Sequence, residues 1–427
     1  MGRFERRWRA RSRRHWAILI ASLALVVIGV RLALGERASP GVVVLPPPTR
    51  HSLTFTTAAA VETTVERAPP VAGATRGNGR VEVCGLGQVE AAADGSIDPA
   101  ILARMPALAA ARRRVMESLA SSGDDFERAA SLWLRIFDPA SATLAADFRE
   151  RLAQSATTTR DPRVYALAFK TCAKALEAGS CTLLSARRWA QLDSSNGAPW
   201  IYVFDEATTR KDRQQAEEAL FRLGAAARVD DRFYAVAGLL AGHAGKSDME
   251  LLTANELATE ANGLAAAEFV PLQTVANACR GPALLDDNRH QRCDAIASAL
   301  ADRSDALWFA STGAAIGRSL GWPSPRTESI AALSAANTES MPTQEPSPLR
   351  WSCRQTADVL ERYARQSVVG EVRFAREWIE ASGTTVERYA ARQAEVRRRQ
   401  AEALSRATNT STLAAPLAAS DAGDSGR

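Results

Sequence analysis

Histidine and lysine are scarce in this chain of 427 residues, and no two cysteines form a C-x₂-C pair. The histidines are His15, His51, His243 and His290, and the lysines are Lys170, Lys174, Lys211 and Lys246. Because structural zinc sites need four Cys or His ligands at close spacings, we expect no metal site. The basic residues are nearly all arginine, which is a bias of composition, so we assign no site to single arginines.

A complete nucleotide-binding loop is also absent. The stretch "LLAGHAGKSD" (239–248) contains Gly-Lys-Ser at 245–247. The first glycine of the G-x₄-G-K-[ST] motif would fall at position 240, which is Leu240. The preceding residues predict a helix, whereas the motif follows a strand. We therefore expect no nucleotide and no other cofactor.

The same stretch predicts the end of one helix and the start of the next. Gly242 or Gly245 suits the left-handed conformation that ends many helices. Ser247 suits the N-cap of the following helix, and Glu250, three residues later, completes a capping box.

Catalytic motifs are missing as well. The chain has no G-x-S-x-G nucleophile elbow. Beyond the linker, only His243 and His290 are available as the base of a Ser–His pair. We predict that the protein is not an enzyme and assign no catalytic residue. Aspartate and glutamate are plentiful, so an envelope hydrolase that cleaves cell-wall material with a carboxylate pair is the alternative.

The net charge of +5 is concentrated at one end of the chain. Residues 1–16 contain seven arginines and one glutamate, a net charge of +6, so the rest of the chain has a net charge of −1. A nucleic-acid-binding protein carries basic residues over its folded body. The distribution argues against a nucleic-acid partner and predicts a cytoplasmic arm in front of a membrane segment.

An apolar run follows the basic arm directly. Residues 17–30 are apolar, and continuing the run across Arg31 gives about 28 Å of helix, enough to span a bilayer. We predict a single-pass signal anchor at 17–35 in a bacterial-type inner membrane, with the N-terminus cytoplasmic and the remainder periplasmic. Two alternatives stay open. Cleavage near Gly35 would release a secreted periplasmic protein, and "SRRHW" resembles a twin-arginine export signal.

Composition divides the rest of the chain. Residues 36–80 are rich in Pro, Ala and Thr, which predicts an extended, disordered linker. Residues 407–427 are small and polar, which predicts a disordered tail. The folded extracytoplasmic domain is therefore expected at residues 81–406.

All six cysteines lie beyond the apolar run, in agreement with an exported, disulfide-bonded domain. Six cysteines allow fifteen pairings. The favoured pairs are Cys172 with Cys181, Cys279 with Cys293, and Cys84 with Cys353. The first would staple a helical hairpin, the second would close a loop rich in turn residues, and the third would tie the start of the domain to its C-terminal helices. The alternative is six separate buried thiols.

Apolar residues recur every three or four positions from Ile101 onward, which predicts an all-α domain. Only 6% of the residues are aromatic and alanine is abundant, so we expect the helices to pack through small side chains. One stretch, "RVEVCGLGQV" (80–89), predicts a strand. The helices expected after Ala244 are 247–262, 264–280, 292–318, 324–336 and 348–406.

The segment 192–220 resembles a tetratricopeptide repeat. The residues that match the repeat's turn, aromatic position, inter-helix aspartate and second-helix alanine are Leu192, Asp193, Asn196, Trp200, Asp212 and Ala216. Asp161, Asp193 and Asp230 are 32 and 37 residues apart, on either side of the 34-residue period of such repeats.

Two residues depart from this pattern: Ser194 replaces the turn proline, and Lys211 replaces the glycine between the helices. The resemblance, which covers residues 161–231, implies stacked helical hairpins with a concave groove for a peptide or protein. An irregular α-helical domain without a groove is the alternative. We predict an irregular array of helical hairpins, tetratricopeptide-like in part, behind one transmembrane helix and a disordered linker.

The predicted function follows from the tether and the fold. We expect a membrane-anchored scaffold or binding module without catalysis, whose partner is an envelope protein or peptide. The charged stretch 386–404 predicts a solvated helix with Glu–Arg pairs three and four positions apart. A structural envelope protein that associates with itself through residues 348–406 is the second alternative.

Overall fold

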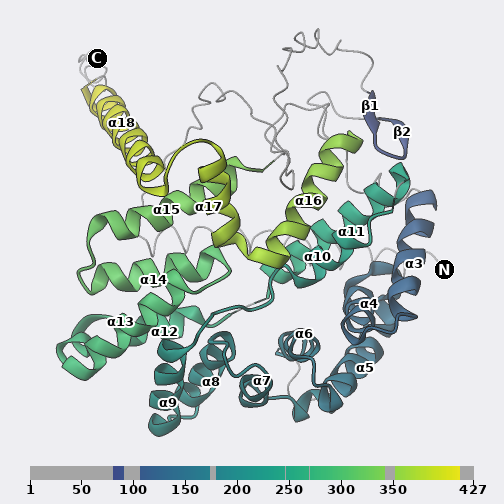
Figure 1. Cartoon of the computed structure of the whole chain (residues 1–427), viewed down its shortest axis with the longest axis horizontal. Coiled ribbons are helices and arrows are strands. Elements are labelled where there is room, and N and C mark those ends of the chain that lie inside the picture. Colours follow the sequence, from purple (N-terminus) through teal and green to yellow (C-terminus); the bar gives the residue numbers. More distant parts are fainter. Residues whose placement is uncertain are drawn as a thin grey trace, which may run out of the picture. The chain divides into compact units, whose positions relative to one another are not determined.

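Figure 1 shows the computed structural model of the chain, which describes residues 80–90, 106–173, 179–245, 247–268, 270–341 and 352–413. The expected arm (1–16), membrane segment (17–35) and nearly all of the linker (36–80) lie outside these residues. No helix in the described part of the chain is both long and apolar enough to cross a membrane. The chain divides into two compact units, the main unit Leu53–Val386 and a second unit made of Met1–Ser52 and Glu387–Arg427.

Helices make up most of the described residues, which confirms the all-α class. The α-helices of the main unit are α3 (Pro106–Ala120), α4 (Asp125–Phe137), α5 (Ala145–Thr158), α6 (Pro162–Cys172), α7 (Ala186–Leu192), α8 (Ala198–Thr209), α9 (Arg213–Ala225), α10 (Ala235–Gly242), α11 (Asp248–Ala266), α12 (Leu272–Ala278), α13 (Asp287–Asp302), α14 (Leu307–Ser319), α15 (Ser324–Glu339), α16 (Cys353–Val369) and α17 (Glu371–Ala381). Its 3₁₀ helices are η1 (Pro139–Leu144), η2 (Gly179–Leu183) and η3 (Gly281–Leu285). Helix α18 (Val386–Leu413) belongs to the second unit from its second residue onward.

A β-hairpin stands where a single strand was predicted. Strand β1 (Arg80–Val83) pairs antiparallel with β2 (Gly87–Glu90) through a turn at 84–86. In this turn Gly85 has φ +74°, and a Cβ on it would lie 2.7 Å from the Cα of Met249 at the start of α11. Only glycine accommodates both the positive φ and the close approach, so the turn can rest on the helix.

The residues between α10 and α11 confirm one prediction and correct another. The capping box is present, with the Ser247 backbone N–H donating to Glu250 Oε2 at 3.1 Å and the Glu250 N–H donating to Ser247 Oγ at 3.4 Å. The expected left-handed glycine was wrong: α10 ends at Gly242 with His243 as C-cap at φ −92°, and neither Gly242 nor Gly245 has a positive φ. Gly245 has a steric role, because a Cβ there would lie 2.9 Å from Glu250 Cβ.

Several expected helices are interrupted or displaced. The predicted helix 292–318 consists of α13 and α14, because the loop between them leaves the helical path to pair with another segment: the Val229 N–H donates to the Arg303 carbonyl at 2.8 Å. The predicted helix 348–406 consists of α16, α17 and α18, with a break at Gly370, whose φ is +78°. Helix α18 extends to Leu413, so residues 407–413 are helical where a disordered tail was expected, and the rest of that expected tail lies outside the described residues.

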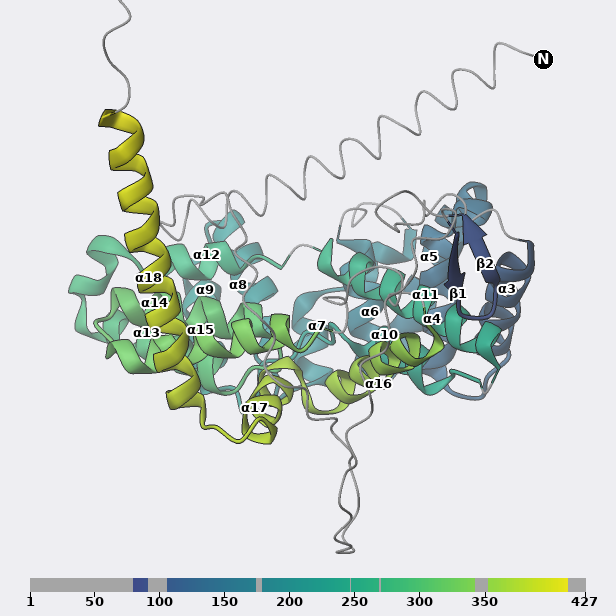
Figure 2. The ribbon, with the colours of Figure 1, turned by 90° about the horizontal axis from the view of Figure 1, so that it is seen from above.

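The helices of the main unit form a closed ring (Figure 1). Each contacts the next in the order α3, α4, α5, α6, α7, α8, α9, α13, α14, α15, α17, α16, α10 and α11, and α11 contacts α3 again. Figure 2 places α3–α5, α10 and α11 at one side of the unit and α8, α9 and α12–α15 at the other. The order follows the sequence only as far as α9.

An extended segment, 226–234, causes this change of order. Its Arg228 forms a bridge with Asn196 in the α7–α8 turn, and its Val229 forms a bridge with Ser304 in the α13–α14 loop. The backbone hydrogen bonds of the segment are therefore satisfied between two loops, and α10 begins beside α11 and α16 instead of beside α9.

Candidate functional site

A cluster of polar side chains lies inside the main unit, which we call the interior cluster: Lys170, Tyr202, Asp231 and Glu268. Lys170 near the end of α6 has a side chain only 5% exposed, and its Nζ lies 2.8 Å from Glu268 Oε2 just after α11. Asp231 in the extended segment is 2% exposed, and its carboxylate accepts the backbone N–H of Phe233 at 3.1 Å. The cluster thus joins α6 and α8 to segments that follow α9.

Aromatic rings surround part of this cluster. The Tyr202 ring centroid lies 5.3 Å from that of Phe169 and 5.8 Å from that of Trp189. Among the described residues, the Tyr202 hydroxyl and Glu268 Oε1 have no hydrogen-bond partner. The low polarity of such surroundings strengthens the attraction between Lys170 and Glu268.

Burial and neighbouring charges set the protonation of the interior cluster. Burial raises the pKa of Asp231 to about 6, although the Lys170 charge opposes this shift. Burial lowers the pKa of Lys170, but the carboxylates of Glu268 and Asp231 act in the other direction and the net pKa is raised. Burial also raises the pKa of Tyr202 well above its ordinary value. Lys170 therefore stays charged at neutral pH, while Asp231 titrates in the mildly acidic range.

The turn between α7 and α8 makes a second buried polar group. The Asn196 amide donates to Asp193 Oδ2 at 3.0 Å and to the Asp230 carbonyl at 2.6 Å, and its Oδ1 accepts the Asp230 N–H at 2.9 Å. Arg228 and Arg232 form ion pairs with both Asp193 and Asp230. Two residues that match the repeat pattern therefore hold the extended segment in the interior.

A third buried network joins α14, α15, α16 and α17. Glu371 accepts the Tyr234 hydroxyl at 2.6 Å, the Leu307 N–H at 2.9 Å and the Asn337 amide at 3.2 Å. The Arg362 guanidinium donates to Asn337 Oδ1 at 2.6 Å. Every one of these groups is bound by another member of the network, so the network holds five segments together: the four helices α14–α17 and, through Tyr234, the segment 226–234.

Two carboxyl groups of this region have raised pKa values. Asp231 and Asp305 both have pKa values raised to about 6, by burial first, which suits a general acid or base. A catalytic carboxyl must also come within hydrogen-bond reach of a substrate. Asp231 is enclosed by protein, so we assign it a structural role.

A recess of about 430 Å³ opens on the surface of the main unit between α9, η3 and α13. Its lining residues are Glu217, Ala283, Asp286, Asn288, Arg289 and Arg292. Arg289 and Arg292 both pair with the single carboxylate of Glu217. Each guanidinium has five N–H donors, far more than one carboxylate can accept, so donors remain for a ligand carboxylate.

Two exposed apolar side chains lie on α9 and η3, the elements that form this recess together with α13. Phe221 is 60% exposed and follows Glu217 by one helical turn of α9, on the same face. Leu285 is 86% exposed and immediately precedes Asp286, which lines the recess. Aromatic and arginine side chains are enriched in protein interfaces, and this surface supplies both types in Phe221, Arg289 and Arg292.

The structure joins the six cysteines in the three pairs that the sequence favoured. Cα–Cα distances are 4.6 Å for Cys84–Cys353 and 5.5 Å for both Cys172–Cys181 and Cys279–Cys293. The second bridge links the end of α6 to η2, and the third links the end of α12 to α13 and closes the loop that contains η3. The first, across 269 residues, joins the β-hairpin to the start of α16.

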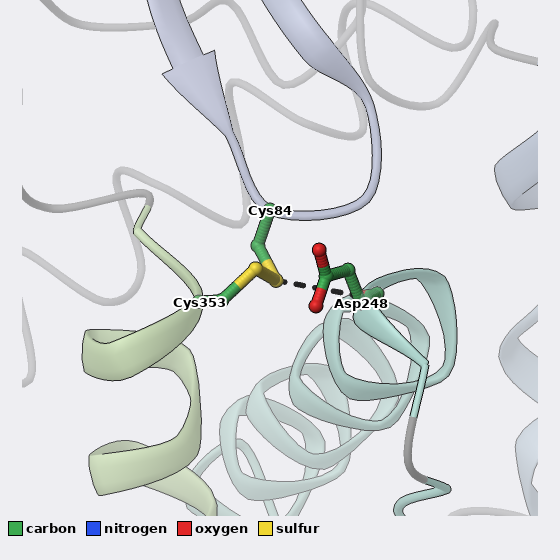
Figure 3. Close-up of side chains that lie close together, drawn as sticks. All are labelled: Cys84, Asp248 and Cys353. Atoms are coloured by element: carbon green, nitrogen blue, oxygen red, sulfur yellow. Dashed lines mark hydrogen bonds between the residues drawn. A yellow bond between two sulfur atoms is a disulfide. The ribbon is translucent and has the colours of Figure 1, made fainter.

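The Cys84–Cys353 bridge has an acidic neighbour. Figure 3 shows the Asp248 carboxylate, at the start of α11, beside the two sulfur atoms. One ligand atom from each of the three residues lies within 4.8 Å of the others. Cys84 Sγ also lies 3.4 Å from the Asp248 backbone carbonyl oxygen. In the described part of the chain, this is a group of three residues with metal-ligating atoms, which the sequence did not predict.

The other residues considered in the sequence lie apart from these sites. His243 Nδ1 lies 2.9 Å from the Leu239 carbonyl oxygen, and its Nε2 lies 3.5 Å from a Glu127 oxygen. Its side chain therefore interacts with the end of α10 and with α4. Lys246 lies outside the described residues.

Two signals in the sequence pointed to residues that the sequence analysis missed. Lys170 is one of only four lysines and stands in the apolar stretch "VYALAFKTC", where a charged residue is unexpected. Phe221 is an apolar residue on the otherwise charged face of α9. The pairing of Asp248 with the distant cysteines had no such signal.

Comparisons of the chain with protein-family models, with curated proteins and with solved structures find no match. The tetratricopeptide resemblance of residues 161–231 therefore stays a prediction.

Proposed function

We propose that this chain is a membrane-tethered, extracytoplasmic scaffold that binds a peptide segment of an envelope protein at the recess between α9, η3 and α13. The observation that carries the proposal is a recess lined by two arginines, with the exposed apolar side chains Phe221 and Leu285 on the elements α9 and η3 that form it. The tether at 17–35 is inferred from the sequence, and the three disulfides support an oxidising compartment.

The chemistry of the recess defines the segment that would bind. Phe221 and Leu285 would cover an apolar side chain of the partner. Arg289 and Arg292 would donate hydrogen bonds to a carboxylate, from an acidic side chain or a chain terminus, in addition to those they donate to Glu217. The partner segment therefore carries an apolar residue next to a carboxylate.

The rigidity of the recess supports this assignment. The Cys279–Cys293 bridge closes the loop that contains η3, and Asp286 caps α13 by accepting the Arg289 N–H at 2.8 Å. A preformed site loses less conformational entropy on binding than a mobile loop does.

Site-specific photocrosslinking in cells tests the proposal. A photoreactive residue at position 221 or 285 of the full-length chain should give a discrete adduct, and the crosslinked peptide should contain an apolar residue next to a carboxylate. Leu183 is a matched control, because it is also apolar and is 69% exposed on η2. The Arg289→Glu/Arg292→Glu double variant should reduce the adduct at 221 at least about tenfold.

Two results would contradict the proposal. An adduct of equal yield at position 183, or an adduct that persists in the double variant, would show that the recess does not select the partner. Cleavage of wall polymers by the purified chain would instead favour the envelope-hydrolase alternative. Far-UV circular dichroism of each variant would show that the helical fold is retained.

A further inference from the structure

The three disulfides differ in their accessibility. Cys172, Cys181, Cys279 and Cys293 are all almost fully buried. In the bridge between Cys84 and Cys353, Cys84 is buried but Cys353 is half-buried. Because an attacking thiolate must reach a sulfur atom, the Cys84–Cys353 bridge is the one open to reduction in the folded protein.

The helix termini reinforce this difference. Cys353 is the first residue of α16, a helix of 17 residues, with Ser352 as its N-cap. A helix N-terminus stabilises a thiolate. Cys172 is the last residue of α6 and Cys279 is the C-cap of α12, and a helix C-terminus disfavours a thiolate. During reduction, the Cys353 thiolate is therefore a better leaving group than the thiolates released from the other two bridges.

Asp248 provides a third ligand atom at the same place. It is the exposed first residue of α11, and no hydrogen bond or ion pair of its carboxylate is found among the described residues. The close contact of Gly85 with the start of α11 holds the hairpin turn, and hence Cys84, beside it. Figure 3 shows the three side chains converging from the hairpin, α11 and α16.

We propose that Cys84, Cys353 and Asp248 form a redox-gated site that binds one Zn²⁺ ion when the disulfide is reduced. Two thiolates and a carboxylate within 4.8 Å of one another match the ligand types and spacing of a zinc site. Three protein ligands leave the fourth tetrahedral position to water. The exposed side of Asp248 gives the ion a way in.

The chemistry balances with a dithiol reductant of the compartment. The dithiol transfers two electrons and two protons to the bridge and becomes a disulfide, which leaves thiols at Cys84 and Cys353. Zn²⁺ then displaces both thiol protons and forms two Zn–S bonds, while the ionised Asp248 carboxylate supplies the oxygen ligand. The ion thereby restores a link between the hairpin and α16 that reduction had removed.

Zinc binding to the full-length chain in detergent tests this site. The protein is treated with a phosphine reductant without denaturant, desalted under argon and titrated with Zn²⁺ against a chromophoric chelator. We expect about one tightly bound ion after reduction and none before it. Substituting Cd²⁺ should produce the ultraviolet thiolate-to-metal absorption of a site with two sulfur ligands.

Matched variants separate this site from adventitious binding. Asp248→Asn should weaken Zn²⁺ binding at least about tenfold, because even supporting residues of metal sites contribute that much. Asp287→Asn should leave it unchanged, since Asp287 is likewise an exposed first residue of a helix beside a cysteine-bridged loop. The Cys279→Ser/Cys293→Ser double variant should bind as the unmodified chain does.

Several outcomes would overturn the proposal. Two free thiols without a bound ion, unchanged affinity in Asp248→Asn, or retained binding in Cys353→Ser would each do so. Asp248 is exposed and asparagine has nearly the same size and shape, so Asp248→Asn tests the site even where the cysteine variant fails to fold.

Discussion

The helices from α6 to α9 pack around the ring in the order of the sequence, whereas after α9 the ring continues with α13, α14, α15, α17, α16, α10 and α11. Both regions are rich in alanine, and both begin their helices with side-chain caps such as Asp212 and Ser247. They differ in what lies between the helices. Short turns join α7 to α8 and α8 to α9, while the extended segment 226–234 separates α9 from α10.

This difference explains why the packing order of the helices departs from the sequence after α9. In an array of helical hairpins, each turn brings the next helix back against the preceding one. Here the extended segment pairs with two loops and α13 takes the place beside α9. The buried polar contacts of Lys170 and Asn196 hold that segment and the region after it. Removing these contacts should therefore lower the free energy of unfolding more than substitutions within either region do.

The largest expected effect is at Lys170. Lys170→Met should lower the free energy of unfolding by about 3–5 kcal/mol at pH 7, because it leaves buried carboxylates of Glu268 and Asp231 without their cation. Urea unfolding of the full-length chain in detergent, followed by far-UV circular dichroism, measures this. Lys211→Met is the control, since Lys211 is exposed and should cost less than about 0.5 kcal/mol. Equal losses of unfolding free energy in the two variants would contradict the stabilising role assigned to the interior cluster.

Asn196 should come next. Asn196→Ala removes both amide hydrogen bonds to the segment and turn and leaves the Asp230 N–H unpaired, at a cost of about 3 kcal/mol. The same unfolding experiment applies, with the exposed Asn288→Ala as control. If both substitutions prove neutral, the turn does not hold the segment.

Asp231 should make stability depend on pH. Its pKa is raised from 3.8 to about 6 in the folded protein, so the folded state holds a proton that the unfolded state has lost. Stability is therefore higher at pH 4 and falls as pH rises toward 6. Asp231→Asn should make this fall shallower by about 2–3 kcal/mol. Asp305 contributes in the same window and remains in the variant. Parallel pH profiles of the two proteins would contradict the assignment.

Within the irregular region, the capping box can be tested alone. Ser247→Ala should cost about 1 kcal/mol, because the N–H of Glu250 loses its acceptor at the start of α11. Ser247→Asp should retain most of the stability, since aspartate also caps helices. Thermal unfolding of both variants distinguishes the lost cap from a general effect of substitution.

Within the regular region, one residue is strained. Lys211 adopts φ +60°, at the position where the repeats it resembles have glycine. Lys211→Gly should raise the free energy of unfolding by about 0.5–1 kcal/mol, because glycine carries no Cβ penalty there. Lys211→Ala should give no gain. A stabilised alanine variant would show that the lysine side chain, and not the backbone, is unfavourable.

Local signals predicted much of the fold. Apolar periodicity identified the helices, Ser247 and Glu250 identified a cap, and the match around Asn196 identified the turn that holds the extended segment. The breaks within 292–318 and 348–406 were missed, because each depends on a partner far away in the chain: the first on pairing with Val229, and the second on Glu371 reaching Tyr234. The recess was missed for the same reason, since η3 and α9 lie far apart in sequence.

The sequence by itself determined the helical class and several helix starts, because periodicity and capping act over a few residues. Tertiary structure alone decided that α9 contacts α13, that the ring closes at α3 and α11, and that Asp248 lies beside Cys84 and Cys353. Those contacts depend on which surfaces can be buried together once the extended segment has taken its place, and no local pattern specifies that choice.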